Sequence, residues 1–387
     1  MKVPQRHAIK ALFLLIAINV GLALSCKSIR FERPFQIGLA TPLTGAEAQT
    51  GIDMRDGALL AIEEVNKIGG INGRRIELIV KDDKSDPQEA ARIAKDFVSN
   101  PDIIAVIGHL NSDCSIVASK IYEQANLTMV APVSTSDALT SNGFRNVFRI
   151  PIRNSNQAQS AARWISKKGY NRLAIIDDGG AYGNGIASEF ERVAESAIKP
   201  YGGVVVLREH FNKSNPDFRP LIAKILAASA DVVYFGGTYP SAALLLRQAA
   251  ESKVQFDLVG GDGIFAPRFI EIAGKAAERA TVTFIAPLPD GTGKTPAFYQ
   301  SFRERFDHAP VAYAPLSYDA ANIVLKALSQ APSPNRMALL QTIHSPNFVL
   351  EGVTGVIRFD ESGENIQAGR EPYFYIVKEG RFVLTSP

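Results

Sequence analysis

Short apolar runs alternate with longer segments of helical periodicity from Phe35 almost to the end of the chain. Residues 103–107 (IIAVI) form a continuous apolar run, which is typical of a buried strand. Residues 52–67 instead place their apolar side chains on one stripe, as an amphipathic helix does. Strands that alternate with helices favour parallel sheets covered by helices on both faces. Two series of this kind, separated near Pro151, predict an α/β fold with two doubly wound parallel-sheet lobes.

The same pattern predicts the individual elements. In the first series we expect strands at residues 36–41, 76–82, 103–108, 127–132 and 147–150, and helices at 52–67, after Asp86 and after Ser112. In the second series we expect strands at 172–177, 203–211, 231–237 and 256–261, separated by helices at 182–196, 217–228 and 240–251. Asp86 is a typical helix-capping residue, because Pro87 follows in the first turn and Glu89 stands at the capping-box position.

Polar turns follow two neighbouring strands of the first series. They are residues 108–115 (GHLNSDCS) and residues 131–137 (APVSTSD). In open α/β sheets, ligands bind beyond the carboxyl ends of the strands, where free N–H groups at helix starts attract anions. Gly108 allows a close approach of the backbone, and Ser112 and Thr135 each offer a hydroxyl. Together the turns predict a carboxylate-binding site; the simpler alternative is that both hydroxyls only cap helices.

The first residues are predicted to be a secretory signal. Lys2, Arg6 and Lys10 precede an apolar run at residues 11–24, which is too short to span a bilayer and has the length of a signal-peptide core. A buried N-terminal helix is the alternative. Cleavage after Ser25 would leave Cys26 at the new N-terminus, a site that resembles the acylated cysteine of bacterial lipoproteins, and both the acylated and the unmodified state remain open.

Export also changes the charge and the disulfide chemistry. Residues 1–25 hold three basic and no acidic side chains, so their removal takes the net charge from +3 to zero and leaves no electrostatic case for binding nucleic acid. The chain has 2 cysteines, Cys26 and Cys114. Because Cys26 lies at the processing site, we expect Cys114 to be unpaired and buried.

The segment from Phe35 to Leu384 resembles the periplasmic leucine/isoleucine/valine (branched-chain amino acid) binding proteins, which are the substrate-binding proteins of ABC transporters. The resemblance is carried by IGLATPLTG (37–45), GALLAIEEVNKIGGINGRRIELIVKDD (57–83), VIGHLNS (106–112), YGNG (182–185), YFGGTYP (234–240) and GGDG (260–263). Each motif is weak alone, and together they are specific. The same resemblance extends to the extracellular domains of metabotropic glutamate receptors, so it indicates a fold and a style of binding better than one ligand.

The resemblance implies a type I periplasmic binding fold, in which a three-segment hinge joins the lobes. We expect the crossings near Pro151, Ile285 and Gly352. This gives a signal peptide at 1–25, lobe one at 34–152 plus 285–351, and lobe two at 153–284 plus 352–387. Residues 280–287 and helices at 296–306 and 313–330 would extend lobe one, and strands at 355–359, 372–380 and 381–385 would pair with lobe two.

The resemblance also implies binding residues. In that family, turns of lobe one hold the ligand's α-carboxylate and carboxylates of lobe two hold its ammonium. The matching positions here are Leu110, Asn111, Ser112, Val133, Thr135, Asn154, Tyr182, Thr238, Asp262 and Tyr313. Asp262 keeps the acidic character of its position, although an acidic residue between glycines is also common in turns.

Several positions depart from the family pattern. Asn154 replaces a second carboxylate, and it gives up a charge-assisted hydrogen bond, which is about twice as strong as a neutral one. Thr50 and Thr238 stand where larger aromatic residues are usual, so we expect a roomier pocket and a ligand range beyond Leu, Ile and Val. Tyr239 either compensates for Thr238 or belongs to the core. The family's disulfide between the positions of Ser85 and Asn111 is absent here.

Other functional classes find little support in the sequence. The motif GTGKT (291–295) lacks the first glycine of a phosphate-binding loop, because that position is Leu288. No Gly-x-Ser-x-Gly elbow occurs, and the 5 histidines lack metal-ligand spacing. His109 lies in a predicted binding turn, where we expect it to support the turn. We therefore expect no enzyme activity, no metal and no cofactor.

The predicted function is that of the extracytoplasmic solute-binding component of an ABC importer. Hinge closure would capture an amino acid (branched-chain, neutral or related) between the lobes. The expected partners are this small molecule and the permease and ATPase subunits of the importer, with the protein acting as a monomer, periplasmic or lipid-anchored at the outer face of the cytoplasmic membrane. Two alternatives remain open: an amide, urea-like or amine-free carboxylate ligand, and a sensory role in place of transport.

Overall fold

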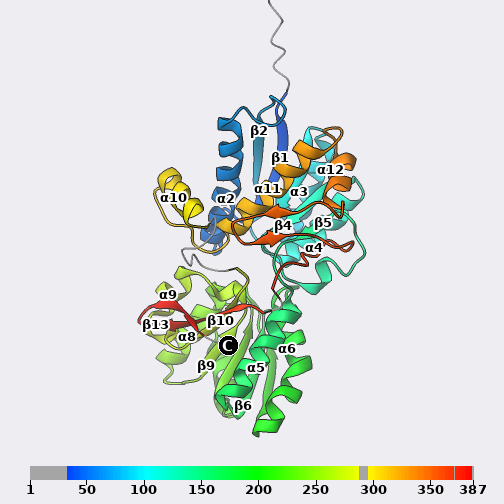
Figure 1. Cartoon of the computed structure of the whole chain (residues 1–387). Helices are drawn as coiled ribbons and strands as arrows, with labels where there is room; N and C mark the ends of the chain where they lie inside the picture. The colour runs from blue at the N-terminus through cyan, green and yellow to red at the C-terminus, as the bar shows by residue number, and fades with distance from the viewer. Residues whose placement is uncertain (1–32, 287–294, 370, 386–387) are drawn as a thin grey trace, which may run out of the picture. The chain divides into compact units, whose positions relative to one another are not determined.

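A computed structural model describes residues 33–286, 295–369 and 371–385. The predicted signal peptide, Cys26 and residues 291–294 of the GTGKT motif lie outside these residues. Two sheets, each with helices on both faces, form the two lobes seen in Figure 1. Within the described ranges, no helix has the length and apolar character needed to cross a bilayer. The predicted α/β fold with two doubly wound lobes is confirmed.

The first sheet has five parallel strands in the order β2-β1-β3-β4-β5. Its elements are β1 (Phe35–Thr41), α2 (Ala48–Lys67), β2 (Ile76–Asp82), α3 (Pro87–Ser99), β3 (Ile103–Gly108), α4 (Ser112–Glu123), β4 (Thr128–Ala131) and β5 (Val147–Arg149), with a short 3₁₀ turn at Asp137–Leu139. Asp86 caps α3 as predicted, because its carboxylate accepts hydrogen bonds from the N–H groups of Gln88 and Glu89. The side chain of Glu89 binds Arg92 and does not close the capping box.

The second sheet has seven strands in the order β14-β13-β10-β9-β8-β6-β7. Its elements are α5 (Asn154–Lys168), β6 (Arg172–Asp177), α6 (Gly183–Ile198), β7 (Val204–His210), α7 (Arg219–Ala227), β8 (Val232–Gly236), α8 (Tyr239–Glu251), β9 (Asp257–Gly260), α9 (Pro267–Ala273), β10 (Thr281–Phe284), β13 (Tyr373–Lys378) and β14 (Arg381–Thr385), with 3₁₀ turns at Lys199–Tyr201, Asp262–Ile264 and Gly274–Ala277. Strands β6 to β10 are parallel, and β13 and β14 add an antiparallel edge.

Two of the predicted strands belong elsewhere. Residues 280–287 were expected in lobe one, but β10 pairs with β9 and β13 in the second sheet. Residues 355–359 were expected to pair with lobe two, but β12 (Val356–Ile357) pairs with β11 (Leu350–Glu351) in a separate two-stranded sheet. Glu364, a little further on, forms an ion pair with Arg149 at the end of β5. This contact favours a third crossing between residues 365 and 373 over the predicted one at Gly352, and the lobe boundaries stay a prediction.

A buried carboxylate joins the beginning of the chain to its last third. The helices α10 (Thr295–Phe306), α11 (Ala314–Gln330) and α12 (Arg336–Ile343) follow β10 in the chain. Asp53 of α2 accepts hydrogen bonds of 2.7–2.9 Å from four successive N–H groups, at residues 311–314, where α11 begins. A Cβ on Gly57 would lie 2.1 Å from the carbonyl oxygen of Ala314, so only glycine permits this approach of α2 to α11. Burial raises the pKa of Asp53, and the four N–H donors oppose that shift.

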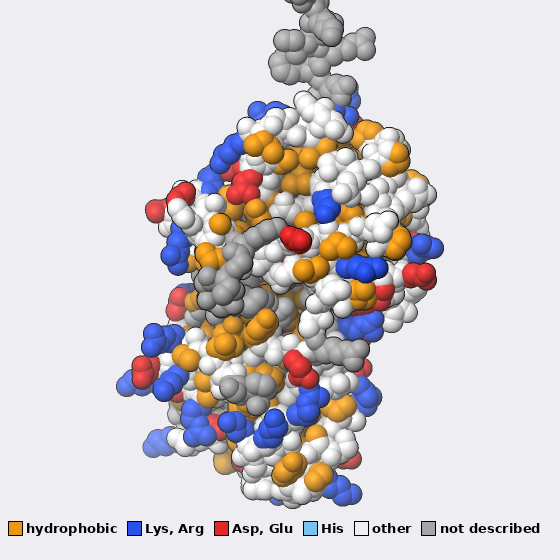
Figure 2. Space-filling model, viewed as in Figure 1, with side chains coloured by type: hydrophobic (Ala, Val, Ile, Leu, Met, Phe, Trp, Pro, Cys, Tyr) orange, Lys and Arg blue, Asp and Glu red, His pale blue; other side chains and the backbone are white. Residues whose placement is uncertain are grey.

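Helix α5 was not predicted, although the sequence carries a signal for its end. Gly169 follows the last turn with φ 74°, the left-handed conformation that glycine provides at helix C-termini. On the face shown in Figure 2, both acidic and basic side chains occur on each lobe, and basic side chains are the more frequent on the lower one. Cys114 is free and buried, as predicted.

Candidate functional site

The two predicted turns of the first lobe lie side by side at the carboxyl ends of β3 and β4. Ser112 begins α4, and its hydroxyl oxygen accepts a hydrogen bond from the N–H of Ser136 at 3.3 Å. The first N–H groups of any helix lack intrahelical acceptors, so the start of α4 offers donors to an anion. The hydroxyl of Thr135 is buried and has no hydrogen-bond partner among the described residues. An open hydroxyl and free helical N–H groups are the donors that a carboxylate needs.

His109 supports these turns through buried hydrogen bonds. Its ring nitrogens lie 2.7 Å from a carboxylate oxygen of Asp83 and 3.2 Å from the hydroxyl of Tyr122. Its carbonyl oxygen accepts hydrogen bonds from the hydroxyls of Ser115 and Ser134, one from each turn. All of these contacts are to protein groups, and they tie the two turns together, as expected of a supporting residue.

Asp262 lies on the second lobe, in the turn that follows β9. It is only 2% exposed, and one carboxylate oxygen accepts hydrogen bonds from the Gln157 amide at 2.7 Å and the Tyr182 hydroxyl at 3.0 Å. The N–H of Asp262 itself and the Tyr313 side chain also favour the ionised carboxylate. Burial raises the pKa of Asp262 to about 6, although the hydrogen bonds from Gln157 and Tyr182 oppose the shift. At neutral pH the site therefore presents a largely ionised carboxylate.

Tyrosines connect the site to both lobes. The Tyr182 hydroxyl also accepts a hydrogen bond from the N–H of Gly263 at 2.8 Å, and burial next to Asp262 raises the pKa of Tyr182, which keeps the phenol protonated. The Tyr313 hydroxyl, at the start of α11, donates to the carbonyl oxygen of Asp262 at 3.0 Å. The Tyr239 hydroxyl, at the start of α8, donates to the carbonyl oxygen of Ala46.

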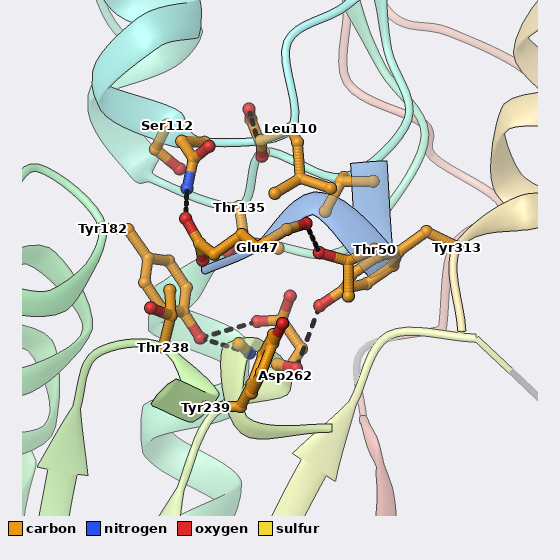
Figure 3. A pocket seen from close by; sticks show the side chains of 14 residues that line it. Glu47, Thr50, Leu110, Ser112, Thr135, Tyr182, Thr238, Tyr239, Asp262 and Tyr313 are labelled. Atoms are coloured by element: carbon orange, nitrogen blue, oxygen red, sulfur yellow. Dashed lines mark hydrogen bonds between the residues drawn. The ribbon is translucent and has the colours of Figure 1, made fainter. Parts of the chain in front are cut away.

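These groups enclose one pocket between the lobes, drawn in Figure 3. It contains about 390 Å³ of space, open solvent at its mouth included. Its lining residues are Glu47, Thr50, Leu110, Asn111, Ser112, Val133, Ser134, Thr135, Tyr182, Thr238, Tyr239, Asp262, Gly263 and Tyr313. Nine of the ten predicted binding residues are in this set, and their role in binding stays a prediction.

Asn154 is the exception. It is fully buried at the start of α5, and its amide nitrogen donates to the carbonyl oxygen of Tyr182 at 3.3 Å. Asn154 is not among the residues that line the pocket, and its amide oxygen is buried without a hydrogen-bond partner among the described residues. Its role in binding stays a prediction.

Glu47 also lines the pocket, and the sequence analysis did not name it. It precedes α2, and one carboxylate oxygen accepts hydrogen bonds from the Ser85 hydroxyl at 2.8 Å and the Asn111 amide at 3.0 Å. These are the two positions at which the resembling family carries its disulfide. An acidic residue three positions before Thr50, in the motif EAQTG, was the available signal. Within the described part of the chain, no group of three or more His, Cys, Asp or Glu side chains could hold a metal ion.

Comparison with known proteins identifies the family. Residues 34–381 match the family model described as periplasmic binding protein. The chain belongs to the periplasmic binding protein family. This periplasmic binding protein is 32% identical over 333 residues to the leucine-, isoleucine-, valine-, threonine- and alanine-binding protein of Pseudomonas aeruginosa, with 85% of this chain and 86% of the relative covered.

Solved structures agree with this assignment. A leucine-binding protein from Thermotoga maritima superposes with a TM-score of 0.81 at 28% identity, covering 91% of this chain and 97% of the other. A branched-chain amino acid transporter substrate-binding protein from Streptococcus pneumoniae, solved in complex with isoleucine, also gives a TM-score of 0.81, at 26% identity over 92% of this periplasmic binding protein and 100% of the other chain. The predicted type I periplasmic binding fold is confirmed.

Proposed function

We propose that this protein is the extracytoplasmic solute-binding component of an ABC importer and that it captures an α-amino acid between its two lobes. The observation that carries the proposal is the polarity of the pocket. Unpartnered donors of the first lobe, including the Thr135 hydroxyl, face a buried carboxylate of the second lobe, Asp262. A zwitterionic amino acid matches this arrangement, with its carboxylate on the first lobe and its ammonium on Asp262.

Closure of the lobes is the proposed mechanism of capture. Contacts between the lobes support it: Asp113 of α4 accepts a hydrogen bond from the N–H of Ala181 at 2.8 Å, and the Tyr313 hydroxyl donates to the carbonyl oxygen of Asp262. Both contacts join groups on different lobes, so they form only when the lobes meet. Hinge closure around a ligand is a known conformational change of such two-lobed proteins.

Export and partners follow from the same proposal. A signal peptide at residues 1–25 would direct the chain out of the cytoplasm, and Cys26 would be either the free N-terminus or a lipid anchor. The closed protein would then deliver its ligand to permease and ATPase subunits without catalysing a reaction. The curated relatives named for binding leucine, isoleucine and valine support an amino acid as the cargo.

A calorimetric titration tests the proposal. Mature protein is titrated with the proteinogenic amino acids and, as comparison compounds, with amides, urea and simple carboxylic acids. We expect binding of at least one α-amino acid and weaker binding of its decarboxylated and deaminated analogues. Tight binding of an amine-free carboxylate or an amide, with no amino acid bound, contradicts the proposal.

A further inference from the structure

We propose that Glu47 selects the ligand's side chain, and that the pocket prefers an α-amino acid whose side chain ends in a positively charged nitrogen. The inference rests on the proposed function, because it concerns the same pocket. It goes further in naming a chemical class of ligand and the residue that recognises it.

The first argument is the charge of the pocket. Of the described residues that line it, Glu47 and Asp262 are acidic, and none is Lys, Arg or His. A neutral amino acid brings one ammonium and one carboxylate, so it pairs with Asp262 and with the donor turns and leaves Glu47 without a counter-charge. A diamino acid brings a second ammonium, and each acidic side chain then has a cationic partner.

The second argument is the fixed orientation of Glu47. Its Oε2 accepts hydrogen bonds from Ser85 and Asn111, and its backbone carbonyl accepts one from the Thr50 hydroxyl at 2.7 Å. No hydrogen bond from the described part of the chain reaches Oε1. Figure 3 shows the Glu47 side chain directed toward the Ser112 turn, beside the space that the lining residues enclose. A carboxylate held in this way is already oriented for a ligand, which lowers the entropic cost of binding.

The third argument is the cost of an aliphatic ligand. A branched apolar side chain against Glu47 would cover a carboxylate oxygen without giving it a hydrogen bond, and such burial costs about 1–3 kcal/mol or more. Thr50, Thr238 and Tyr239 add hydroxyl groups to the pocket wall, while Leu110 and Val133 remain as apolar surface. A methylene stem with a charged end, as in lysine or ornithine, suits such a mixed wall better than leucine does.

A purely architectural role for Glu47 is the competing explanation. In that case its only task is to join Ser85 to Asn111, and its removal weakens every ligand alike. The proposal instead requires discrimination between ligands that differ only in the distal ammonium.

The experiment uses ligand pairs of matched shape. Calorimetry gives the Kd of L-lysine and L-norleucine, which lacks only the ε-amino group, and of L-ornithine and L-norvaline, which lacks only the δ-amino group. For the wild-type protein we expect the diamino acid to bind about 10- to 150-fold more tightly than its partner in at least one pair, the range for a hydrogen bond to a charged group. In Glu47→Gln, which keeps the size and one acceptor oxygen, this ratio should fall toward one. Glu63→Gln, on the outer part of α2 and paired with Arg305, is the control and should keep the wild-type ratio.

Each outcome decides the question. Wild-type ratios near one in both pairs overturn the proposal without any variant, so a folding failure of Glu47→Gln cannot hide the answer. A ratio that persists in Glu47→Gln, or equal weakening of all four ligands, also overturns it. If norleucine or leucine binds and the ratios are near one, only this inference fails. If no amino acid binds at all, the proposed function fails with it.

Discussion

Replacement of Asp262 by asparagine tests the binding mechanism most directly. The carboxylate is buried, and one oxygen is already occupied by Gln157 and Tyr182. Asparagine retains the shape and an oxygen acceptor for these two groups, but it removes the negative charge proposed to hold the ligand's ammonium. The change therefore isolates the charge from the packing.

The expected loss of affinity follows from the burial of the pair. Removal of one partner of a buried, hydrogen-bonded charge pair costs about 2–5 kcal/mol, and each 1.4 kcal/mol is about tenfold in Kd. An amino acid ligand should therefore bind about 30- to 5000-fold more weakly to Asp262→Asn. Because asparagine still accepts a neutral hydrogen bond, we expect a value near the lower end of this range.

Although Asp262→Asn should weaken ligand binding, it should raise the free energy of unfolding of the ligand-free protein. Burial raises the pKa of Asp262 from 3.8 to about 6, so the folded state takes up a proton more readily than the unfolded state. Below pH 3.8 the carboxyl group is protonated in both the folded and the unfolded state, so its burial carries no charge penalty. As the pH rises from 3.8 to about 6, only the unfolded state releases its proton, and the folded state loses stability relative to it. Above that pH, the ionised buried carboxylate costs up to about 3 kcal/mol. Without ligand, Asp262→Asn should thus be more stable than the wild type at pH 7.5, and the difference should shrink toward pH 4.5.

Two measurements check these expectations. Calorimetric titration gives the Kd at pH 7.5, and urea unfolding at pH 7.5 and 4.5 gives the free energy of unfolding without ligand. Asp257→Asn, at the opposite end of β9 and paired with Arg279, is the matched control and should leave the Kd within about twofold, because it lies outside the pocket. A Kd for Asp262→Asn that also stays within this range would remove Asp262 from the binding site.

Three further changes test other parts of the structure. Thr135→Val deletes a hydroxyl that has no hydrogen-bond partner in the described part of the chain, so the unfolding free energy should stay constant or rise, while calorimetry should show ligand binding weakened by about 1 kcal/mol, or fivefold. Asp113→Ala removes the acceptor of the Ala181 N–H on the other lobe, and stopped-flow measurements should show ligand release accelerated by about tenfold, whereas an unchanged release rate would exclude this contact from closure. Asp53→Ala leaves four N–H groups of the α11 start without their acceptor, and urea unfolding should show a loss of about 3 kcal/mol or more; a loss below about 1 kcal/mol contradicts the capping role.

Much of the fold could be predicted because strand and helix periods are local properties. The apolar run at residues 103–107 became β3 at Ile103–Gly108, and Asp86 and Pro87 marked the start of α3. Strand pairing is not local: nothing within residues 355–359 indicates that Val356 and Ile357 pair with the segment just before them and not with the second sheet. Propensity identifies a strand, while its partner depends on the packing of the whole chain.

For the binding site, too, only the residues with a local sequence signal could be predicted. Ser112, Thr135 and Asp262 could be proposed because each stands in a turn after a strand, where the sheet topology directs ligands. Glu47 could not, because it precedes a helix, and its carboxylate is held at the pocket by Ser85 and Asn111, which are 38 and 64 residues away in the sequence. Asn154 matches a binding position in the sequence, but the helix that begins at this residue was not predicted, so its burial could not be foreseen.

The link between Asp53 and the start of α11 has a consequence for the order of assembly. The two sides of this link are about 260 residues apart, and almost the whole second lobe lies between them in the sequence. During synthesis, the first lobe cannot be completed until residue 314 has emerged from the ribosome. Until then, helix α2 lacks its packing partner α11. Such dependence on distant segments slows folding. A fragment that ends before residue 311 would therefore leave Asp53 without the four N–H donors that hold α2 to the start of α11.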